Sequence, residues 1–321
     1  MKSAIAILTL WRDSEPYIHN SLNQFAQLEK VLSDHYEIYY SFYENDSSDN
    51  TASILKNWLD QRNGILINEN LFAPKWGSVP SLKRTMTLAS YRNKCLNSIS
   101  NIKYDYLFVV DSDICYSPNL LQVMLFKMDK YPLLGMITSN TVQNVKDVFH
   151  NQNLCSYYDS WALIDINGNP GLSFSSNPFL VNHDRLLWEA KKPVIVNSAF
   201  GGAALIRGAL MRDNQLFWQG DTGCEHWHLC RSIRSLNYFV VVDPLLKAEI
   251  THRKIVTPDF ILVNFDKTRL KLSYLGNRSL KYATLNIILR LNLAFLYLLL
   301  KIKRFLSSKA IFQRARNILQ R

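Results

Sequence analysis

Short apolar runs alternate with longer amphipathic stretches over the first 110 residues of the chain. A short run of β-branched and aromatic residues is typical of a buried strand, whereas apolar residues spaced three and four apart are typical of a helix. Strands that alternate with helices favour an α/β fold, with a mostly parallel sheet flanked by helices. The pattern predicts strands at 4–10, 36–43, 64–67 and 106–110, and helices at 16–32, 52–61 and 83–100.

The rest of the chain has a weaker pattern. A turn of small residues at 197–204 precedes a helical segment at 224–234, and short strands are predicted at 238–242 and 248–251. With 321 residues, of which 48% are hydrophobic, the chain is long enough to bury a core as one large domain or two small ones.

The N-terminal apolar stretch, 3–11, runs into a charged segment without a small-residue cleavage site, so it is predicted to be a buried strand and not a signal peptide. Five cysteines, an odd number without a paired framework, indicate a reducing compartment. We therefore expect a cytoplasmic protein.

Positive charge is concentrated at the C-terminal end. The formal net charge of +11 would by itself suggest a nucleic-acid partner. However, 13 of the 37 Lys and Arg residues follow Asp266, after which no acidic residue occurs. Residues 1–266 carry 24 basic and 26 acidic residues. Because this body is nearly neutral, we expect no nucleic-acid partner.

The basic tail, 267–321, contains a charge-free apolar stretch of ten residues, 291–300, which is too short for a confident transmembrane helix. An amphipathic helix flanked by Lys and Arg fits the surface of an anionic membrane. The alternative is a helix that packs on the body of the chain or on a second subunit. We predict a body at 1–266 and a tail at 267–321 that lies peripherally on the inner face of a membrane.

Two carboxylates, Asp111 and Asp113, directly follow the strand predicted at 106–110. Side chains at i and i+2 of an extended segment point the same way, so both can converge on one cation. Oxygen ligands of this kind suit Mg²⁺ or Mn²⁺, ions that also bind phosphate oxygens. This Asp-x-Asp (DXD) motif therefore predicts a metal–diphosphate clamp, with a capped turn as the alternative.

A second acidic loop falls on the same predicted edge of the sheet, where ligands of α/β folds bind. It contains Glu44, Asp46 and Asp49, for which capping of the next helix is the alternative. Arg84 and Arg92 lie eight residues apart, close to two helical turns, so one helix face could neutralise a phosphate or stay solvated and ion-paired. The chain has no glycine-rich dinucleotide motif and no P-loop.

Two clusters in the second half each admit two interpretations. Tyr157, Tyr158 and Trp161 could form a platform for a sugar ring, with Asp159 bonding its hydroxyls, or belong to the core. The alternating Cys and His residues at 224–230 could suggest zinc, but the second ligand pair usual for structural zinc is missing from the sequence.

Together these segments resemble the GT-A glycosyltransferases, and more narrowly the fungal capsule-associated α-1,3-mannosyltransferases of glycosyltransferase family 69. The resemblance spans about residues 1–255, and its motifs occur in the family's order. The motifs are Glu44-Asn45-Asp46-Ser47-Ser48-Asp49-Asn50-Thr51, Tyr91-Arg92-Asn93, Asp111-Ser112-Asp113, Tyr157-Tyr158-Asp159-Ser160-Trp161 with Asp165, Phe200-Gly201-Gly202 and Cys224-Glu225-His226.

The resemblance implies a GT-A fold and a metal-dependent hexosyltransferase that takes a sugar from a nucleotide-sugar donor, with GDP-mannose as the first expectation. The acceptor would be a glycan or a lipid-linked glycan, as in polysaccharide biosynthesis. The implied ligands of Mn²⁺ or Mg²⁺ are Asp111, Asp113 and His252, and the implied catalytic residues are Glu225, His226 and Asp159. The implied nucleotide-sugar contacts are Arg12, Glu44, Asp46, Asp49, Arg84, Arg92, Asn93, Asp111, Gly201 and Gly202.

The sequence leaves the stereochemistry of the reaction open and also leaves two alternative functions. An inverting enzyme would use Glu225 to deprotonate the acceptor, whereas in a retaining enzyme Glu225 could position it. A sugar nucleotidyltransferase also holds a metal–phosphate with carboxylates, but its glycine-rich loop would follow the first strand, where 9–13 contains no glycine. The second alternative function is that of a non-catalytic, membrane-associated glycan-binding protein.

Overall fold

The computed structural model describes residues 2–76, 81–147 and 152–250. The chain divides into two compact units, Met1–Pro258 and Asp259–Arg321, and every described residue belongs to the first. The predicted ligand His252 and the basic tail lie outside the described residues. The predicted boundary between 266 and 267 therefore stays a prediction.

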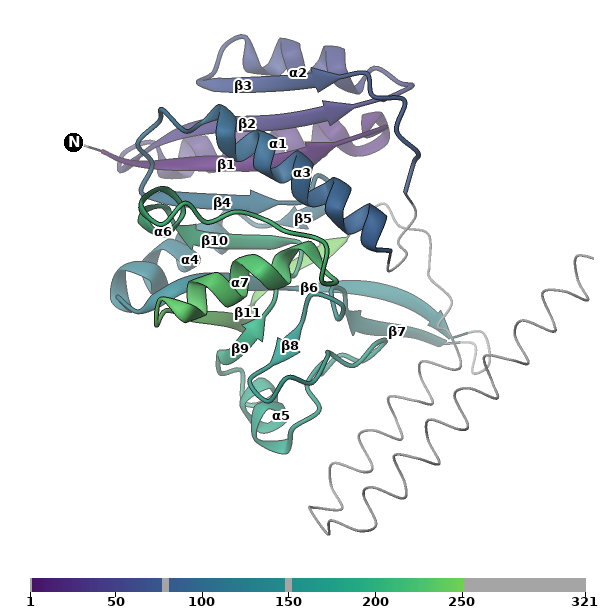
Figure 1. The fold of residues 1–321 in the computed structure, drawn as a ribbon, viewed down its shortest axis with the longest axis vertical. Helices are drawn as coiled ribbons and strands as arrows, with labels where there is room; N and C mark the ends of the chain where they lie inside the picture. Colours follow the sequence, from purple (N-terminus) through teal and green to yellow (C-terminus); the bar gives the residue numbers. More distant parts are fainter. Residues whose placement is uncertain (1, 77–80, 148–151, 251–321) are drawn as a thin grey trace, which may run out of the picture. The chain divides into compact units, whose positions relative to one another are not determined.

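One mixed sheet forms the centre of the unit (Figure 1). Its first four strands are parallel to one another, and β10 then inserts antiparallel between β4 and β6. The strand order is β3 (Gly64–Glu69), β2 (Tyr36–Asn45), β1 (Ser3–Trp11), β4 (Tyr106–Val110), β10 (Ala203–Arg207), β6 (Leu134–Asp147), β11 (Phe239–Ile250), β9 (Val194–Ser198) and β8 (Ile164–Asp165), while β5 (Ile114–Tyr116) pairs with β11 and β7 (Gln152–Tyr157) with β6.

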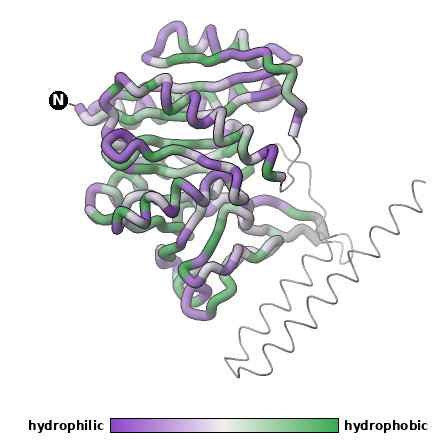
Figure 2. The backbone as a smooth tube through the Cα atoms, viewed as in Figure 1, coloured by the Kyte–Doolittle hydropathy of each residue, from purple (hydrophilic) through white to green (hydrophobic). Residues whose placement is uncertain are grey.

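Helices cover both faces of this sheet (Figure 1). Because strand side chains alternate between faces, Ile5 and Ile7 of β1 pack with α1, α2 and α4, whereas Ala6 and Leu8 pack with α3, α6 and α7. Figure 2 shows hydrophobic residues concentrated along the central strands that these two layers enclose. The helices are α1 (Glu15–Leu32), α2 (Thr51–Leu59), α3 (Leu82–Ser98), α4 (Asn119–Lys130), α5 (Asn182–Glu189), α6 (Gly208–Asp213) and α7 (Glu225–Ser235).

The predicted α/β fold, a mixed sheet flanked by helices as in GT-A proteins, is confirmed. The N-terminal apolar stretch is strand β1, as predicted. Two short strands predicted at 238–242 and 248–251 are one strand, β11, with a register shift between Val242 and Lys247. The sequence pattern did not predict β6, because its centre, 138–141, buries polar side chains in place of the expected apolar ones.

The parallel strands β1, β2 and β4 end at one edge of the sheet. Trp11 at the end of β1 pairs with Glu44 of β2, and Leu8 pairs with Val109 of β4. The loops that follow these strands therefore meet at this carboxyl edge, where ligands of open α/β sheets bind.

Candidate active site

The acidic pair lies in a tight turn after β4. The N–H of Asp111 donates to the carbonyl oxygen of Gly202 at 2.9 Å, and the N–H of Ile114 donates to the carbonyl oxygen of Asp111 at 3.2 Å. Ser112 between the two carboxylates is buried, and its carbonyl oxygen accepts from Ser21 Oγ of α1 at 2.6 Å. Asp111 and Asp113 are both partly exposed. Asp111 and Asp113 thus both reach solvent from the turn while Ser112 between them is buried, but the residues lie in a turn and not in the extended segment that the prediction assumed.

Arg92 of α3 links this turn to α7. Its Nη2 donates to Asp111 Oδ1 at 2.9 Å and lies 3.9 Å from Glu225 Oε1. The side chain is only 3% exposed, and its Cζ lies 4.9 Å from the ring centre of Phe200. Its Nε and Nη1 have no hydrogen-bond partner among the described residues. One buried cation therefore lies against two carboxylates, and two of its nitrogens have no partner among the described residues.

Glu225, the first residue of α7, is buried beside His226. Burial and the positive charges of Arg92 and Arg84 hold the pKa of His226 well below its usual range, so the imidazole is neutral. Trp218 Nε1 donates to His226 Nδ1 at 3.3 Å. The imidazole proton is therefore on Nε2, which lies 3.7 Å from Glu225 Oε1 and has no hydrogen-bond partner among the described residues.

Asn93 fixes Trp218 in turn. Its Nδ2 donates to the carbonyl oxygen of Trp218 at 2.8 Å, and its Oδ1 accepts the Trp218 N–H at 2.9 Å. Asn93 was predicted to contact the nucleotide sugar, yet its amide is occupied with this backbone. Asn93 therefore acts on the site indirectly, because it positions Trp218, which in turn donates to His226.

The predicted glycine pair forms a floor beside the acidic turn. Gly201 and Gly202 have φ values of +66° and +76°, which side chains other than glycine rarely adopt. A Cβ on Gly201 would lie 2.3 Å from the carbonyl oxygen of Ser139. The preceding ring, Phe200, stacks on His226 at 3.9 Å between ring centres. The pair therefore needs glycine to bring its backbone against β6 and the acidic turn.

Asp159 approaches the same cluster from the loop after β7. Its carboxylate accepts the N–H of Gly201 at 3.1 Å and that of Ala162 at 3.3 Å. Loss of water around the carboxyl, together with the negative charges of Asp111 and Glu225, raises the pKa of Asp159 to about 7. Asp159 thus exchanges its proton near neutral pH.

Replacement of Asp159 by Asn is expected to change how stability depends on pH. The pKa is about 7 in the fold against a usual 3.8. Unfolding therefore releases the proton between these pH values, and the fold loses stability as the pH rises through that window. Asp159→Asn removes this loss. Thermal unfolding in metal-free buffer from pH 4 to pH 8 should show the midpoint of Asp159→Asn rising relative to wild type up to about pH 7. A difference that stays constant with pH would contradict the raised pKa.

The predicted donor contacts Arg12 and Asp46 are engaged in local structure at the carboxyl edge. Asp46 Oδ1 accepts the N–H groups of Leu71 and Phe72 at 2.7 and 2.8 Å, and its Oδ2 accepts that of Ala73 at 3.0 Å. Arg12 Nη2 donates to the carbonyl oxygen of Ala73 at 2.9 Å. These two side chains build the loop after β3, and a direct contact with a nucleotide stays a prediction.

Glu44 and Asp49 also have local partners. Glu44 Oε1 accepts the N–H of Ser47 at 2.9 Å. Asp49 accepts the N–H groups of Thr51 and Glu15 at 3.0 Å each, at the starts of α2 and α1. These contacts match the alternative interpretation, in which Asp49 caps a helix start. Asp49 therefore already has hydrogen-bond partners within the protein.

Arg84 lies on the side of α3 that faces the cluster. Its Cζ is 5.9 Å from the ring centre of Trp161, and its charge acts on His226 together with that of Arg92. The two arginines therefore share one helix face, as their spacing predicts. Tyr157 does not join a sugar platform: it is 1% exposed and packs edge-on against Trp188, because its ring completes the core.

The zinc interpretation of 224–230 has no support in the geometry. The ring of His228 lies 5.0 Å from that of Phe217, whereas Cys230 Sγ contacts the carbonyl oxygen of Ala199 at 3.5 Å. These side chains leave α7 in different directions. Among the described residues, no group of three His, Cys, Asp or Glu side chains is arranged to hold a metal.

The chemistry of Asp111 and Asp113 nevertheless fits a hard divalent cation. Mg²⁺ and Mn²⁺ are bound through one or two carboxylates and complete their shell with water and phosphate oxygens. Asp111 gives one oxygen to Arg92, and Asp113 lies two residues further on and is also partly exposed, so both residues have the chemistry of metal ligands and the metal site stays a prediction.

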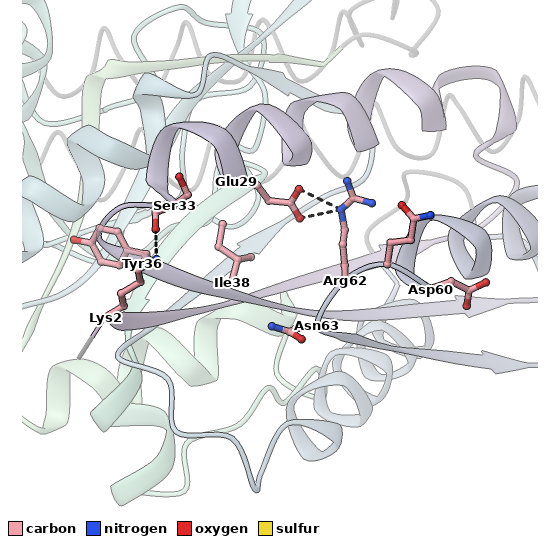
Figure 3. Close-up of a pocket in the computed structure, with 9 residues that line it drawn as sticks. Lys2, Glu29, Ser33, Tyr36, Ile38, Asp60, Arg62 and Asn63 are labelled. Carbon is pink, nitrogen blue, oxygen red and sulfur yellow. Dashed lines mark hydrogen bonds and ion pairs between the residues drawn. The ribbon is translucent and has the colours of Figure 1, made fainter.

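A cavity of about 630 Å³ lies away from this site, beside the starts of β1 and β2 (Figure 3). Polar groups that line it bind one another. Arg62 Nε pairs with Glu29 at 2.9 Å, and Lys2 Nζ donates to the carbonyl oxygen of Ser33 at 2.7 Å. We assign no ligand to it.

Trp218, Phe200 and Tyr17 are parts of the site that sequence reasoning missed as individual residues. Tyr17 lies near the acidic turn, with its hydroxyl 3.3 Å from Ser112 Oγ. Phe200 belongs to the quoted motif Phe200-Gly201-Gly202, but its contact with His226 was not predicted. Tyr17 lies 95 residues from Ser112, so the sequence gives no sign of this contact.

Two solved structures are similar to the chain at low sequence identity. Mannosyltransferase PcManGT from Pyrobaculum calidifontis, in complex with GDP-Man and Mn²⁺, is similar with 13% identity and a TM-score of 0.49 over 85% of this chain and 63% of that one. S. aureus TarS (residues 1–349) in complex with UDP-GlcNAc is similar with 17% identity and a TM-score of 0.46 over 79% and 59%. The chain thus spans about three fifths of the length of these structures. No curated protein matches in sequence.

One family matches over most of the chain. It is described as Cryptococcal mannosyltransferase 1, and the match covers residues 4–234. That range contains all the motifs on which the predicted resemblance rests, from the loop at 44–51 to the segment at 224–226. The predicted family resemblance is therefore confirmed, and the chain belongs to the Cryptococcal mannosyltransferase 1 family.

Proposed function

We propose that this protein is a metal-dependent glycosyltransferase that moves a hexose from a nucleotide sugar to a glycan or lipid-linked glycan at a membrane surface. The observation that carries the proposal is the buried Arg92, which joins Asp111 of the acidic turn to Glu225 of α7. Membership of a mannosyltransferase family makes GDP-mannose the first donor to test.

Asp111 and Asp113 would hold Mn²⁺ or Mg²⁺, which offsets the charge that develops on the nucleoside diphosphate as the glycosidic bond breaks. Arg92 fixes the orientation of Asp111 through its 2.9 Å ion pair. Its unused Nε and Nη1 are donors for the anionic part of a bound nucleotide sugar. Gly201 and Gly202 would support the acidic turn from beneath, since the carbonyl oxygen of Gly202 accepts the N–H of Asp111.

Glu225 is the residue that we assign to the acceptor. His226 Nε2 lies 3.7 Å and Arg92 Nη2 lies 3.9 Å from this carboxylate, so two buried groups flank Glu225. An ionised carboxylate that removes the proton of the acceptor hydroxyl would give inversion at the sugar carbon. One that only orients the acceptor would accompany retention. NMR of the product's anomeric proton distinguishes the two.

A donor panel tests the reaction class. The full chain is incubated with Mn²⁺ and GDP-mannose, GDP-glucose, UDP-glucose or UDP-GlcNAc, with oligomannoside or polyprenyl-linked saccharide as acceptor. We expect the highest rate of nucleoside diphosphate release with GDP-mannose. Release of inorganic diphosphate from GTP and mannose 1-phosphate instead would identify the rival nucleotidyltransferase. No reaction with any donor would leave a glycan-binding protein.

The basic tail supports a peripheral membrane location on the cytoplasmic face. Among residues 2–76, 81–147 and 152–250, no helix is long and apolar enough to cross a membrane. Residues 267–321 carry 13 positive and no negative side chains, and each basic group near an anionic surface contributes about 1 kcal/mol.

Truncation after residue 270 is therefore expected to abolish sedimentation with phosphatidylserine-containing liposomes, while the full chain sediments. Neutral liposomes serve as the control, since they lack the attraction to Lys and Arg. Equal sedimentation of both forms with the anionic liposomes would show that the tail is not the anchor.

A further inference from the structure

A groove of about 560 Å³ runs along α7, opposite β8 and β9. Trp227, Arg231 and Arg234 line it from the helix, and their spacing of four and three residues places them on one helix face. Ile164 of β8 and Asn197 of β9 line the other wall. The groove begins two residues from Glu225, the residue that we assign to the acceptor.

The groove is positively charged. Arg231 is exposed and has no ion-pair partner within the described part of the chain. Arg234 donates from Nη1 to the carbonyl oxygen of Val196 at 3.3 Å and also has no acidic partner there. Two guanidinium groups on one wall without a carboxylate favour an anion, and their planar N–H groups match a carboxylate or phosphate.

A tryptophan connects this charge to the catalytic cluster. Trp227 Nε1 donates to the carbonyl oxygen of Trp161 at 3.3 Å, and the ring of Trp161 lies 5.9 Å from Arg84 Cζ. A Cβ on Gly223 would lie 2.0 Å from the Trp227 ring, so the absence of a side chain there makes room for it. The half-exposed ring offers the flat apolar face on which a sugar packs.

The opposite wall is fixed before any ligand binds. Asn197 Nδ2 donates to the carbonyl oxygens of Asp165 at 2.8 Å and Ile166 at 3.1 Å. A groove with a rigid polar wall, one aromatic face and a few converging charges has the properties of a small-molecule site.

We propose that this groove binds a saccharide that bears an anionic group, either a carboxylate or a phosphate, and that this saccharide is the acceptor. A sugar ring packs on Trp227, and the anionic group lies between Arg231 and Arg234. The assignment as acceptor rests on the proposed function, whereas binding of an acidic saccharide does not.

Calorimetric binding of three tetrasaccharides to the full chain tests the proposal. The probes are a hyaluronan tetrasaccharide with uronate carboxylates, a phosphorylated mannotetraose, and neutral chitotetraose. We expect at least one acidic probe to bind about tenfold more tightly than chitotetraose, and the tighter of the two identifies the anion. Arg231→Ala should weaken that binding about tenfold.

A matched control removes two exposed positive charges from α1 and α2, Lys30→Ala and Lys56→Ala, and should leave the affinity unchanged. Equal affinity for chitotetraose, or an equal loss in the control, would overturn the proposal. Measuring nucleotide release from the donor with the same preparations distinguishes a failure of the proposed reaction from a failure of the proposed saccharide binding. If no donor releases a nucleotide but acidic binding depends on Arg231, the groove stands and the proposed reaction fails.

Discussion

Arg92→Met is expected to cost about 3 kcal/mol of unfolding free energy, as removal of one partner from a buried ion pair does. Arg92 is 3% exposed, and its loss leaves Asp111 without its 2.9 Å partner and the buried Glu225 without a nearby cation. Asp111 keeps some access to water, so the expected cost is at the lower end of such effects. Urea unfolding of the full chain measures it. We also expect loss of donor turnover under conditions where the variant is folded.

Arg62→Met provides the matched control for this prediction. Arg62 pairs with Glu29 at the same 2.9 Å, but the two side chains are 24% and 30% exposed. Ion pairs that reach water contribute about 1 kcal/mol or less, so Arg62→Met should change stability little and leave turnover intact. If Arg92→Met were as stable and as active as Arg62→Met, Arg92 would not be the link between the two carboxylates.

Sequence pattern predicted the parallel half of the fold well, because its strands are apolar on both faces. Ile5, Ile7 and Leu8 of β1 are all fully buried, and such runs are recognisable without a partner strand. The second half was harder to predict, since β6 buries Thr138 and Ser139, whose hydroxyls mask the strand pattern.

The candidate site was predictable where two neighbours in sequence act together. Asp111 and Asp113 both lie partly exposed in the turn that directly follows β4, so their sequence position alone places them at the carboxyl edge of the sheet. Nothing local shows that Asn93 clamps Trp218, 125 residues away, or that Trp218 fixes the proton of His226. These roles depend on the packing of α3 against α7, which only the folded chain brings about.

The acidic residues after β2 show what residue type alone leaves out. Asp46 and Asp49 are suitable ligands by residue type, yet backbone N–H groups of the loop after β3 and of the starts of two helices occupy them. A sequence lists the acceptors but not the unpaired backbone donors that will compete for them.

The most direct test of the metal-dependent reaction is GDP release from GDP-mannose by the full chain with Mn²⁺, compared between wild type and Asp113→Ala. Because Asp113 would hold the cation that stabilises the leaving diphosphate, we expect the rate to fall about a thousandfold. EDTA should reduce the wild-type rate to the same level and leave that of Asp113→Ala unchanged. GDP release that is insensitive to both Asp113→Ala and EDTA, or no release from wild type, would contradict a metal-dependent mannosyltransferase.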